Sequence, residues 1–243
     1  MIADIAARCE LIDDADRILL HAIALAPSDP APRIALAKFR QQIRRMDDAI
    51  QLFDQVLTLQ PGHFGALSLK ALMLLQARRL DEAETAYRDF IQTWPGNEDA
   101  WMNLASILSS LGRYGESVAA YRTAIALNPG YATARQWLAI HLADDGKFDE
   151  AIAEIERARR LDPLSPIIHT AAGAVRYFAR DYAGSIAEYR AVLRMRPQFT
   201  IALALMGRVM LIDGQVGPAV DALRQSVERS GGDPSYRAVY AAA

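Results

Sequence analysis

The sequence has almost no cysteine and no long hydrophobic run. Cys9 is the only cysteine among 243 residues, so a disulfide cannot form within the chain and nothing indicates an oxidising compartment. The longest wholly apolar stretches, such as Ala71 to Leu75, fall far short of the ~20 residues that a membrane-spanning helix needs. Residues 1–10 mix acidic, basic and apolar side chains, unlike a secretory signal. We therefore expect a cytoplasmic protein without a membrane partner.

An excess of positive charge is also absent. The chain has 27 basic and 29 acidic residues, which gives a formal net charge of −2. A protein that binds nucleic acid normally carries a basic stripe that displaces counterions from phosphates. The balance therefore predicts no nucleic-acid partner. Lysine is scarce beside arginine, a bias typical of a GC-rich bacterial gene.

Recognisable catalytic motifs are missing as well. The four histidines show no metal-ligand spacing, and the chain contains no H-E-x-x-H, Gly-rich phosphate loop or G-x-S-x-G elbow. The carboxylate pairs Asp47-Asp48 and Asp144-Asp145 lie near expected turns, where solvated acids are common. We predict no catalysis, no cofactor and no metal site.

What the sequence does have is a period of 34 residues. Six prolines are spaced by this interval: Pro27, Pro61, Pro95, Pro129, Pro163 and Pro197. We number the positions of each unit as slots 1 to 34, so that these prolines occupy slot 32. Such a period is the signature of a repeat architecture, and it has to be found before any other feature is interpreted.

Small and bulky residues recur in the same register. Slot 8 holds Ala3, Ala37, Ala71, Ala105, Ala139, Gly173 and Gly207. Slot 20 holds Ala15, Ala49, Ala83, Ser117, Ala151, Ser185 and Ala219. Slot 24 holds Leu19, Phe53, Tyr87, Tyr121, Ile155, Tyr189 and Leu223. Two small positions and one bulky position are what paired helices need in order to approach closely and interlock.

The spacing of apolar residues predicts two amphipathic helices in each unit, over slots 2–14 and 18–31. Gly112, Gly146 and Gly214 at slot 15 permit the left-handed turn that ends a first helix. The slot-32 proline ends the second helix. The sequence thus predicts an all-α protein.

The unit 98–131 resembles a tetratricopeptide repeat (TPR), and it does so through Trp101, Gly112, Tyr114, Tyr121 and Pro129. The resemblance implies a right-handed superhelical solenoid of antiparallel helix pairs that spans residues 1–243 as a single domain. We expect a partial unit at 1–29, six full units at 30–63, 64–97, 98–131, 132–165, 166–199 and 200–233, and a truncated unit at 234–243. The first helix of the partial unit is expected to be shortened.

The resemblance also implies a function, because first helices line the concave groove of the family through slots 2, 5, 6, 9, 12 and 13. The expected partner is a protein or peptide of apolar or amphipathic character. Carried over to this chain, the candidate groove residues are Lys38, Leu72, Leu75, Met102, Asn103, Ser106, Trp137, Ile140, Tyr177, Phe178, Arg208, Leu211 and Ile212. For some of these residues a structural role is an equal alternative to binding. Packing between adjacent hairpins would account equally well for Tyr177, Phe178 and Trp137.

Three other interpretations remain open at this level. The repeats resemble those beside bacterial sulfotransferase domains and winged-helix or cyclase regulators, so the chain could be an appendage of an enzyme or regulator. No polar capping helix is visible, so uncapped ends could stack on further copies of the chain. Arginine pairs such as Arg44-Arg45 are also compatible with a resemblance to pentatricopeptide proteins, which are arrays of helical hairpins that read RNA. That family has a period of 35 residues, whereas this chain keeps 34.

Overall fold

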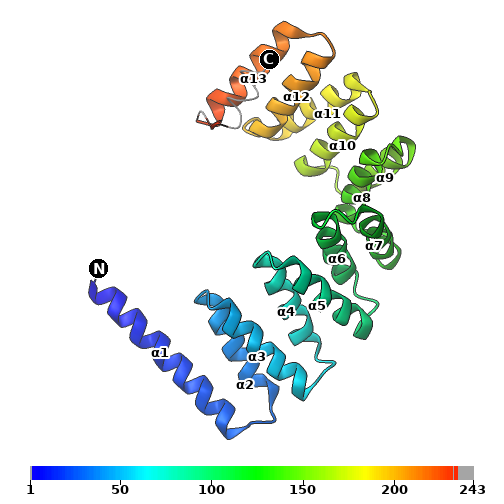
Figure 1. Ribbon diagram of the computed structural model, residues 1–243. Helices are drawn as coiled ribbons and strands as arrows, with labels where there is room; N and C mark the ends of the chain where they lie inside the picture. The colour runs from blue at the N-terminus through cyan, green and yellow to red at the C-terminus, as the bar shows by residue number, and fades with distance from the viewer. Residues whose placement is uncertain (1, 232, 235–243) are drawn as a thin grey trace. The chain divides into compact units, whose positions relative to one another are not determined.

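The structure, a computed structural model, describes residues 2–231 and 233–234. Within these residues it contains thirteen α-helices and no β-strand (Figure 1). Their bounds are α1 Ile2–Leu25, α2 Pro30–Gln42, α3 Met46–Leu59, α4 Phe64–Gln76, α5 Leu80–Thr93, α6 Glu98–Ser110, α7 Tyr114–Leu127, α8 Ala132–Asp144, α9 Phe148–Leu161, α10 Pro166–Phe178, α11 Tyr182–Met195, α12 Thr200–Ile212 and α13 Val216–Arg229. The predicted all-α fold of paired helices is confirmed. Residues 235–243 of the truncated unit lie outside the described part.

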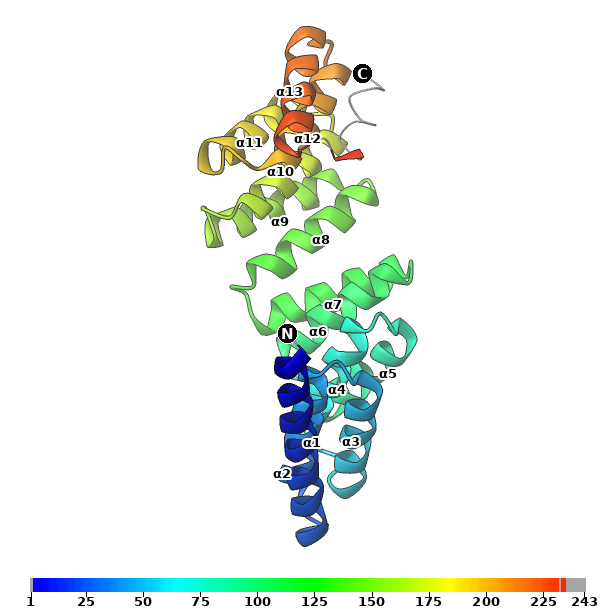
Figure 2. The same ribbon diagram turned by 90° about the vertical axis from the view of Figure 1, so that its left-hand side faces the viewer.

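The chain forms two compact units, residues 1–120 and 121–243. In the first unit, α2 packs on α3 and α4 on α5, while α1 packs on α2. In the second unit, α8 packs on α9, α10 on α11 and α12 on α13. Figures 1 and 2 show the hairpins of each unit following one another in chain order.

Every full repeat places its helices at slots 1–13 and 17–30, so each helix begins and ends one residue before the predicted position. Slot 34 explains the early start of four of the six first helices, because the side chains of Asp29, His63, Asn97 and Ser165 cap the helix that follows. For example, Asn97 Oδ1 accepts a hydrogen bond of 2.8 Å from the backbone N–H of Ala100. Slot 31 explains the early end. Trp94 and Arg196 at this slot precede a proline, which disfavours helical backbone, and their φ angles are −130° and −137°.

The slot-15 turn has the left-handed backbone that the glycines predicted. Gly112, Gly146 and Gly214 have φ between 75° and 80°. Three arginines, Arg44, Arg78 and Arg180, take the same slot with φ of 63°, 60° and 60°. Left-handed backbone costs a non-glycine residue roughly 1–2 kcal/mol, so these turns form under strain.

The small residues lie where the paired helices approach most closely, as predicted. Ser117 Oγ donates a hydrogen bond of 2.8 Å to the carbonyl oxygen of Ala105, which joins slot 20 to slot 8. The slot-8 and slot-20 residues of all six full repeats are buried. A larger side chain at either slot would hold the two helices apart.

In three of the six full repeats the slot-4 side chain fastens the first helix to the turn that precedes it. Trp101 Nε1 donates to the carbonyl oxygen of Pro95 at 2.9 Å, and Arg135 Nη2 donates to that of Pro129 at 2.9 Å. His169 Nε2 lies 3.1 Å from the carbonyl oxygen of Pro163. Three different side chains thus hold the slot-32 carbonyl and fix the angle at which the first helix leaves the turn.

The N-terminal partial unit differs from the expected shortened helix and turn. Residues 2–25 form one continuous helix, α1. Its slot 15 is Glu10, a good helix former, so nothing in the sequence favours the left-handed turn there.

Candidate functional site

The first helix of each repeat has one buried face and one open face. In α6 the buried residues are Ala100, Leu104, Ala105, Ile107 and Leu108, which occupy slots 3, 7, 8, 10 and 11. The candidate slots 2, 5, 6, 9, 12 and 13 lie on the other side of α6, because helical periodicity separates the two sets. In α8, α10 and α12 a few residues at these slots are buried, among them Gln136, Ala171 and Ala204. We call the surface formed by these slots the open face. It is described separately for each compact unit.

In the first unit the open face is mostly uncharged. Lys38 on α2 and Leu72 on α4 are exposed, and Leu75 is partly buried. On α6, Met102, Asn103 and Ser106 are partly buried.

Two of these residues, Leu72 and Asn103, line a recess of about 310 Å³ between α4, α5 and α6. Phe64 forms part of its wall, with its ring centroid 5.2 Å from that of Phe90 in an edge-on arrangement. Phe64 was not among the predicted site residues, because slot 1 is outside the groove slots of the family. Only packing against the following hairpin brings it to the recess.

Tyr87 at slot 24 supplies a polar group to the same recess. Burial raises the pKa of its hydroxyl to about 12, and the negative charge of Asp99 contributes in the same direction. The hydroxyl also hydrogen-bonds to the side chain of Asn103. The recess therefore has apolar walls, the neutral hydroxyl of Tyr87 and an acidic residue, Asp99, a combination suited to a side chain that is partly apolar and partly polar.

In the second unit the predicted residues separate into two groups. Tyr177 and Leu211 pack against the hydrophobic core around Tyr189 and Met206, so they also serve the fold. Trp137, Phe178 and Ile212 remain exposed, with 41%, 43% and 52% of their surface accessible. Ile140 is partly buried, and Arg208 is exposed.

The aromatic side chains at the end of α10 are in contact with one another. The ring centroids of Tyr177 and Phe178 lie 5.4 Å apart, and those of Tyr177 and Tyr182 lie 6.2 Å apart. Phe178 is thus supported by a partly buried neighbour and does not extend freely into solvent. Such support reduces the entropy that a binding residue loses on contact with a partner.

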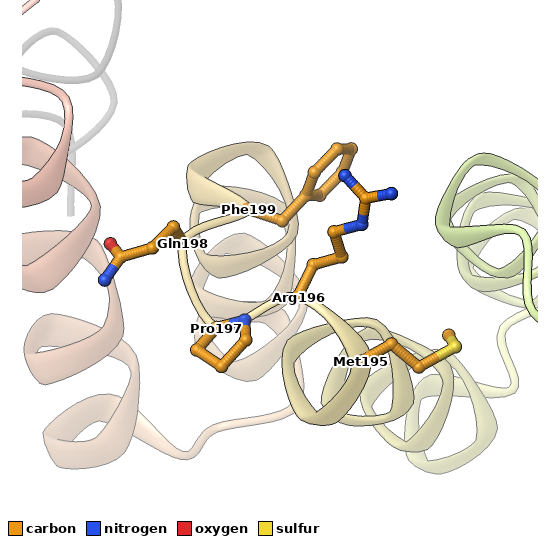
Figure 3. A pocket seen from close by; sticks show the side chains of 5 residues that line it. All are labelled: Met195, Arg196, Pro197, Gln198 and Phe199. Carbon is orange, nitrogen blue, oxygen red and sulfur yellow. The ribbon is translucent and has the colours of Figure 1, made fainter.

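A second kind of recess lies in the turn between α11 and α12. It has a volume of about 320 Å³ and is lined by residues 195–199. Figure 3 shows Met195 and Gln198 pointing in opposite directions from this turn. A similar recess of about 330 Å³ lies at residues 93–97. Phe64 also lines the second of these recesses, and its ring centroid lies 5.4 Å from that of Trp94. Both recesses follow from the repeated turn.

The described residues offer little for other chemistry. No group of three or more His, Cys, Asp or Glu side chains among them could hold a metal ion. Likewise, no helix in the described part combines the length and the apolar character required to cross a membrane.

Comparison with protein families identifies the repeat. The family model for the tetratricopeptide repeat matches residues 34–98, 69–132, 102–166 and 170–234. The chain belongs to the TPR family. No curated protein sequence matches it.

Solved structures of TPR proteins share the fold at low sequence identity. YrrB, a TPR protein described as having an unusual peptide-binding site, is 19% identical with a TM-score of 0.64, over 76% of this chain and 95% of YrrB. PilF of Pseudomonas aeruginosa is 18% identical with a TM-score of 0.68, over 88% and 97% of the two chains. A TPR protein from Parabacteroides merdae is 14% identical with a TM-score of 0.69, over 98% and 94%.

Proposed function

We propose that this TPR chain is a non-catalytic scaffold that binds a protein or peptide partner on the open faces of its first helices. The partner presents an apolar or amphipathic segment. In the first unit, the recess that contains Leu72 and Asn103 receives one of its side chains. In the second unit, Trp137, Phe178 and Ile212 contact the partner directly.

The observation that carries the proposal is the contrast between first and second helices. The second helices carry networks of paired charges. Arg88 on α5, for example, pairs with Glu84 at 2.8 Å and with Glu116 on α7 at 3.2 Å. The open faces of α8, α10 and α12 carry only two charged residues, Asp144 and Arg208, among aromatic and aliphatic side chains. Contiguous exposed apolar surface of this kind marks interaction sites, and large aromatic residues there contribute much of the binding energy.

The TPR fold also supports this proposal, since YrrB is described as a TPR protein with a peptide-binding site. Because YrrB shares so little sequence with this chain, none of its binding residues is assigned to a position here. The binding residues proposed above rest on exposure and packing in this structure.

The test is affinity capture with the wild-type chain and two double variants, followed by quantitative mass spectrometry. Phe178→Ser with Ile212→Ser removes exposed apolar side chains from the open face. Leu127→Ser with Leu161→Ser is the matched control, because these leucines are similarly exposed at the ends of second helices. We expect specific partners to be lost from the first variant and retained by the control. Equal retention by both variants, with unchanged helicity in circular dichroism, would refute the proposed surface.

A second candidate function is self-association through α1. Leu11, Ile18 and Leu25 are spaced by seven residues along one side of this helix, and each is more than 60% exposed. A stripe of this period suits packing against another helix. Sedimentation equilibrium of the wild type and of Ile18→Glu tests it. A wild-type mass that stays monomeric at all concentrations would remove this candidate.

A further inference from the structure

Arg208 lies in the most apolar part of the open face. We call Tyr177, Phe178, Arg208, Leu211 and Ile212 the late patch. Tyr177 and Leu211 pack against the same core, and Arg208 precedes Leu211 by three residues and Ile212 by four, which places it on the same side of α12. Phe178 contacts Tyr177, and Ile212 follows Leu211 in the chain. A guanidinium group is therefore set among aromatic and aliphatic side chains of two neighbouring first helices.

Other arginines on the first helices of this unit have carboxylate partners. Arg135 Nη1 lies 2.6 Å from Glu154 Oε2, and Arg176 Nη2 lies 2.8 Å from Glu156 Oε1. Arg208 is exposed, and within the described residues it forms no ion pair and no side-chain hydrogen bond. Its guanidinium group is therefore open to a partner.

A partner that covers the late patch excludes water from the charged group of Arg208. Excluding water from a guanidinium group without a replacement acceptor is costly, and a carboxylate offers the planar pair of acceptors that matches it. A wholly apolar segment would leave the group unpaired, and a basic segment would repel it. Arg208 therefore discriminates between segments that the surrounding apolar residues would accept equally well.

We infer that the partner segment carries an Asp or Glu side chain that pairs with Arg208, flanked by aliphatic or aromatic residues that pack on Phe178 and Ile212. This inference rests on the proposed function and names the chemistry of the partner. The acidic group is a side chain within the segment and not a chain-terminal carboxylate, because apolar open-face residues lie on both sides of Arg208 along α12: Ile201 and Leu205 before it, and Leu211 and Ile212 after it.

The experiment is a selection of random peptides displayed with their carboxyl termini fused to the carrier, so that only side-chain carboxylates can contribute. The full chain is the immobilised target. We expect enriched peptides to share an Asp or Glu at a fixed spacing from apolar residues. The dissociation constant of an enriched peptide is then measured for the wild type, Arg208→Glu and the control Arg190→Glu. Arg190 is an exposed arginine on α11, away from the open face.

We expect Arg208→Glu to weaken binding roughly 10- to 100-fold, the range for a hydrogen bond to a charged group. Exchanging the acid of the peptide for Lys should restore binding to this variant, and Arg190→Glu should leave it unchanged. Enriched peptides without an acid, or peptides bound equally well by Arg208→Glu, would overturn the inference. If those same peptides still depend on Phe178 and Ile212, the proposed function stands. If no peptide is enriched, or if binding ignores Phe178 and Ile212 as well, both fail.

Discussion

The hydroxyl group of Ser185 on α11 donates a hydrogen bond of 2.7 Å to the backbone carbonyl of Gly173 on α10. This bond joins slot 20 to slot 8, as the bond between Ser117 and Ala105 does two repeats earlier. A Cβ atom at Gly173 would lie 2.6 Å from the ring of Tyr189. The paired helices therefore leave no room for a side chain at Gly173.

Gly173→Ala should destabilise the protein by ~1–3 kcal/mol, because the added methyl group has to displace the buried ring of Tyr189. This cost should exceed the helical preference of Ala over Gly. Gly115→Ala is the control, since nothing lies within 4 Å of a Cβ atom there. Urea unfolding followed by circular dichroism measures both. A stabilised Gly173→Ala variant would mean that the helices can separate at little cost.

Ala83→Leu tests the same contact in the first compact unit. Ala83 at slot 20 is fully buried, so the larger side chain should overpack the hairpin of α4 and α5 and cost ~1–3 kcal/mol. Thr85→Leu, two residues further along α5 at an exposed position, should change the stability little. A neutral Ala83→Leu variant would contradict the assignment of slot 20 to the helix crossing.

Arg78→Gly should stabilise the protein by ~0.5–1 kcal/mol, because glycine accepts a φ of 60° without the clash that arginine has there. The gain is smaller than the strain, since glycine also increases the entropy of the unfolded chain. Gly112→Arg at the same slot should destabilise by a similar amount. Thermal unfolding of the two variants should therefore shift the midpoint in opposite directions, and shifts of the same sign would disprove the strain.

Glu188 is a buried carboxylate in the second unit. It contacts Arg159, and His169 Nδ1 lies 2.8 Å from its Oε2. Glu188→Gln leaves these donors facing a neutral amide, so we expect a loss of ~1–3 kcal/mol. Glu228→Gln alters an exposed pair with Arg224 and should cost less than ~0.5 kcal/mol. Similar losses for the two variants in urea unfolding would show that burial of Glu188 has no energetic consequence.

The buried hydroxyl of Tyr189 should make the free energy of unfolding depend on pH in alkaline solution. Burial raises the pKa of its hydroxyl to about 12, above the ordinary value of 10, while the positive charge of Arg208 opposes the shift. The unfolded chain then loses this proton before the folded chain does. Its contribution to stability is complete below pH 10 and is lost as the pH rises from 10 through 12. The free energy of unfolding of Tyr189→Phe should fall less steeply than that of the wild type over this range. If the free energies of unfolding of the wild type and of Tyr189→Phe fell in parallel from pH 10 to 12, the hydroxyl of Tyr189 would have no part in the pH dependence.

Much of the repeat could be predicted from the sequence, because it depends on residues close together in the chain. The proline at slot 32 ends a helix locally, and glycine at slot 15 adopts the left-handed turn. The predicted helix ends were wrong by one residue, and the cause of this error was also local. The capping side chain at slot 34 and the extended residue before proline at slot 31 were both visible in the sequence, and the helical periodicity alone did not reveal them.

The candidate site could be predicted only as a set of slots. Tyr177 and Phe178 are adjacent in the chain and equally suited to a groove, yet Tyr177 packs on the core and Phe178 is exposed. The difference depends on how α12 packs against α11, which no local pattern encodes. Phe64 joins the recess for a similar reason. It begins α4, and α6 of the following hairpin closes the recess against α4 and α5.

By itself, the sequence determined the 34-residue period, the alternation of two helices and the contact between slots 8 and 20, since proline, glycine and small side chains constrain the backbone wherever they occur. Only the tertiary structure decided which open-face side chains remain accessible and which arginines find carboxylates. Those properties depend on the distances between hairpins, and a distance between residues far apart in the chain exists only once the helices have packed.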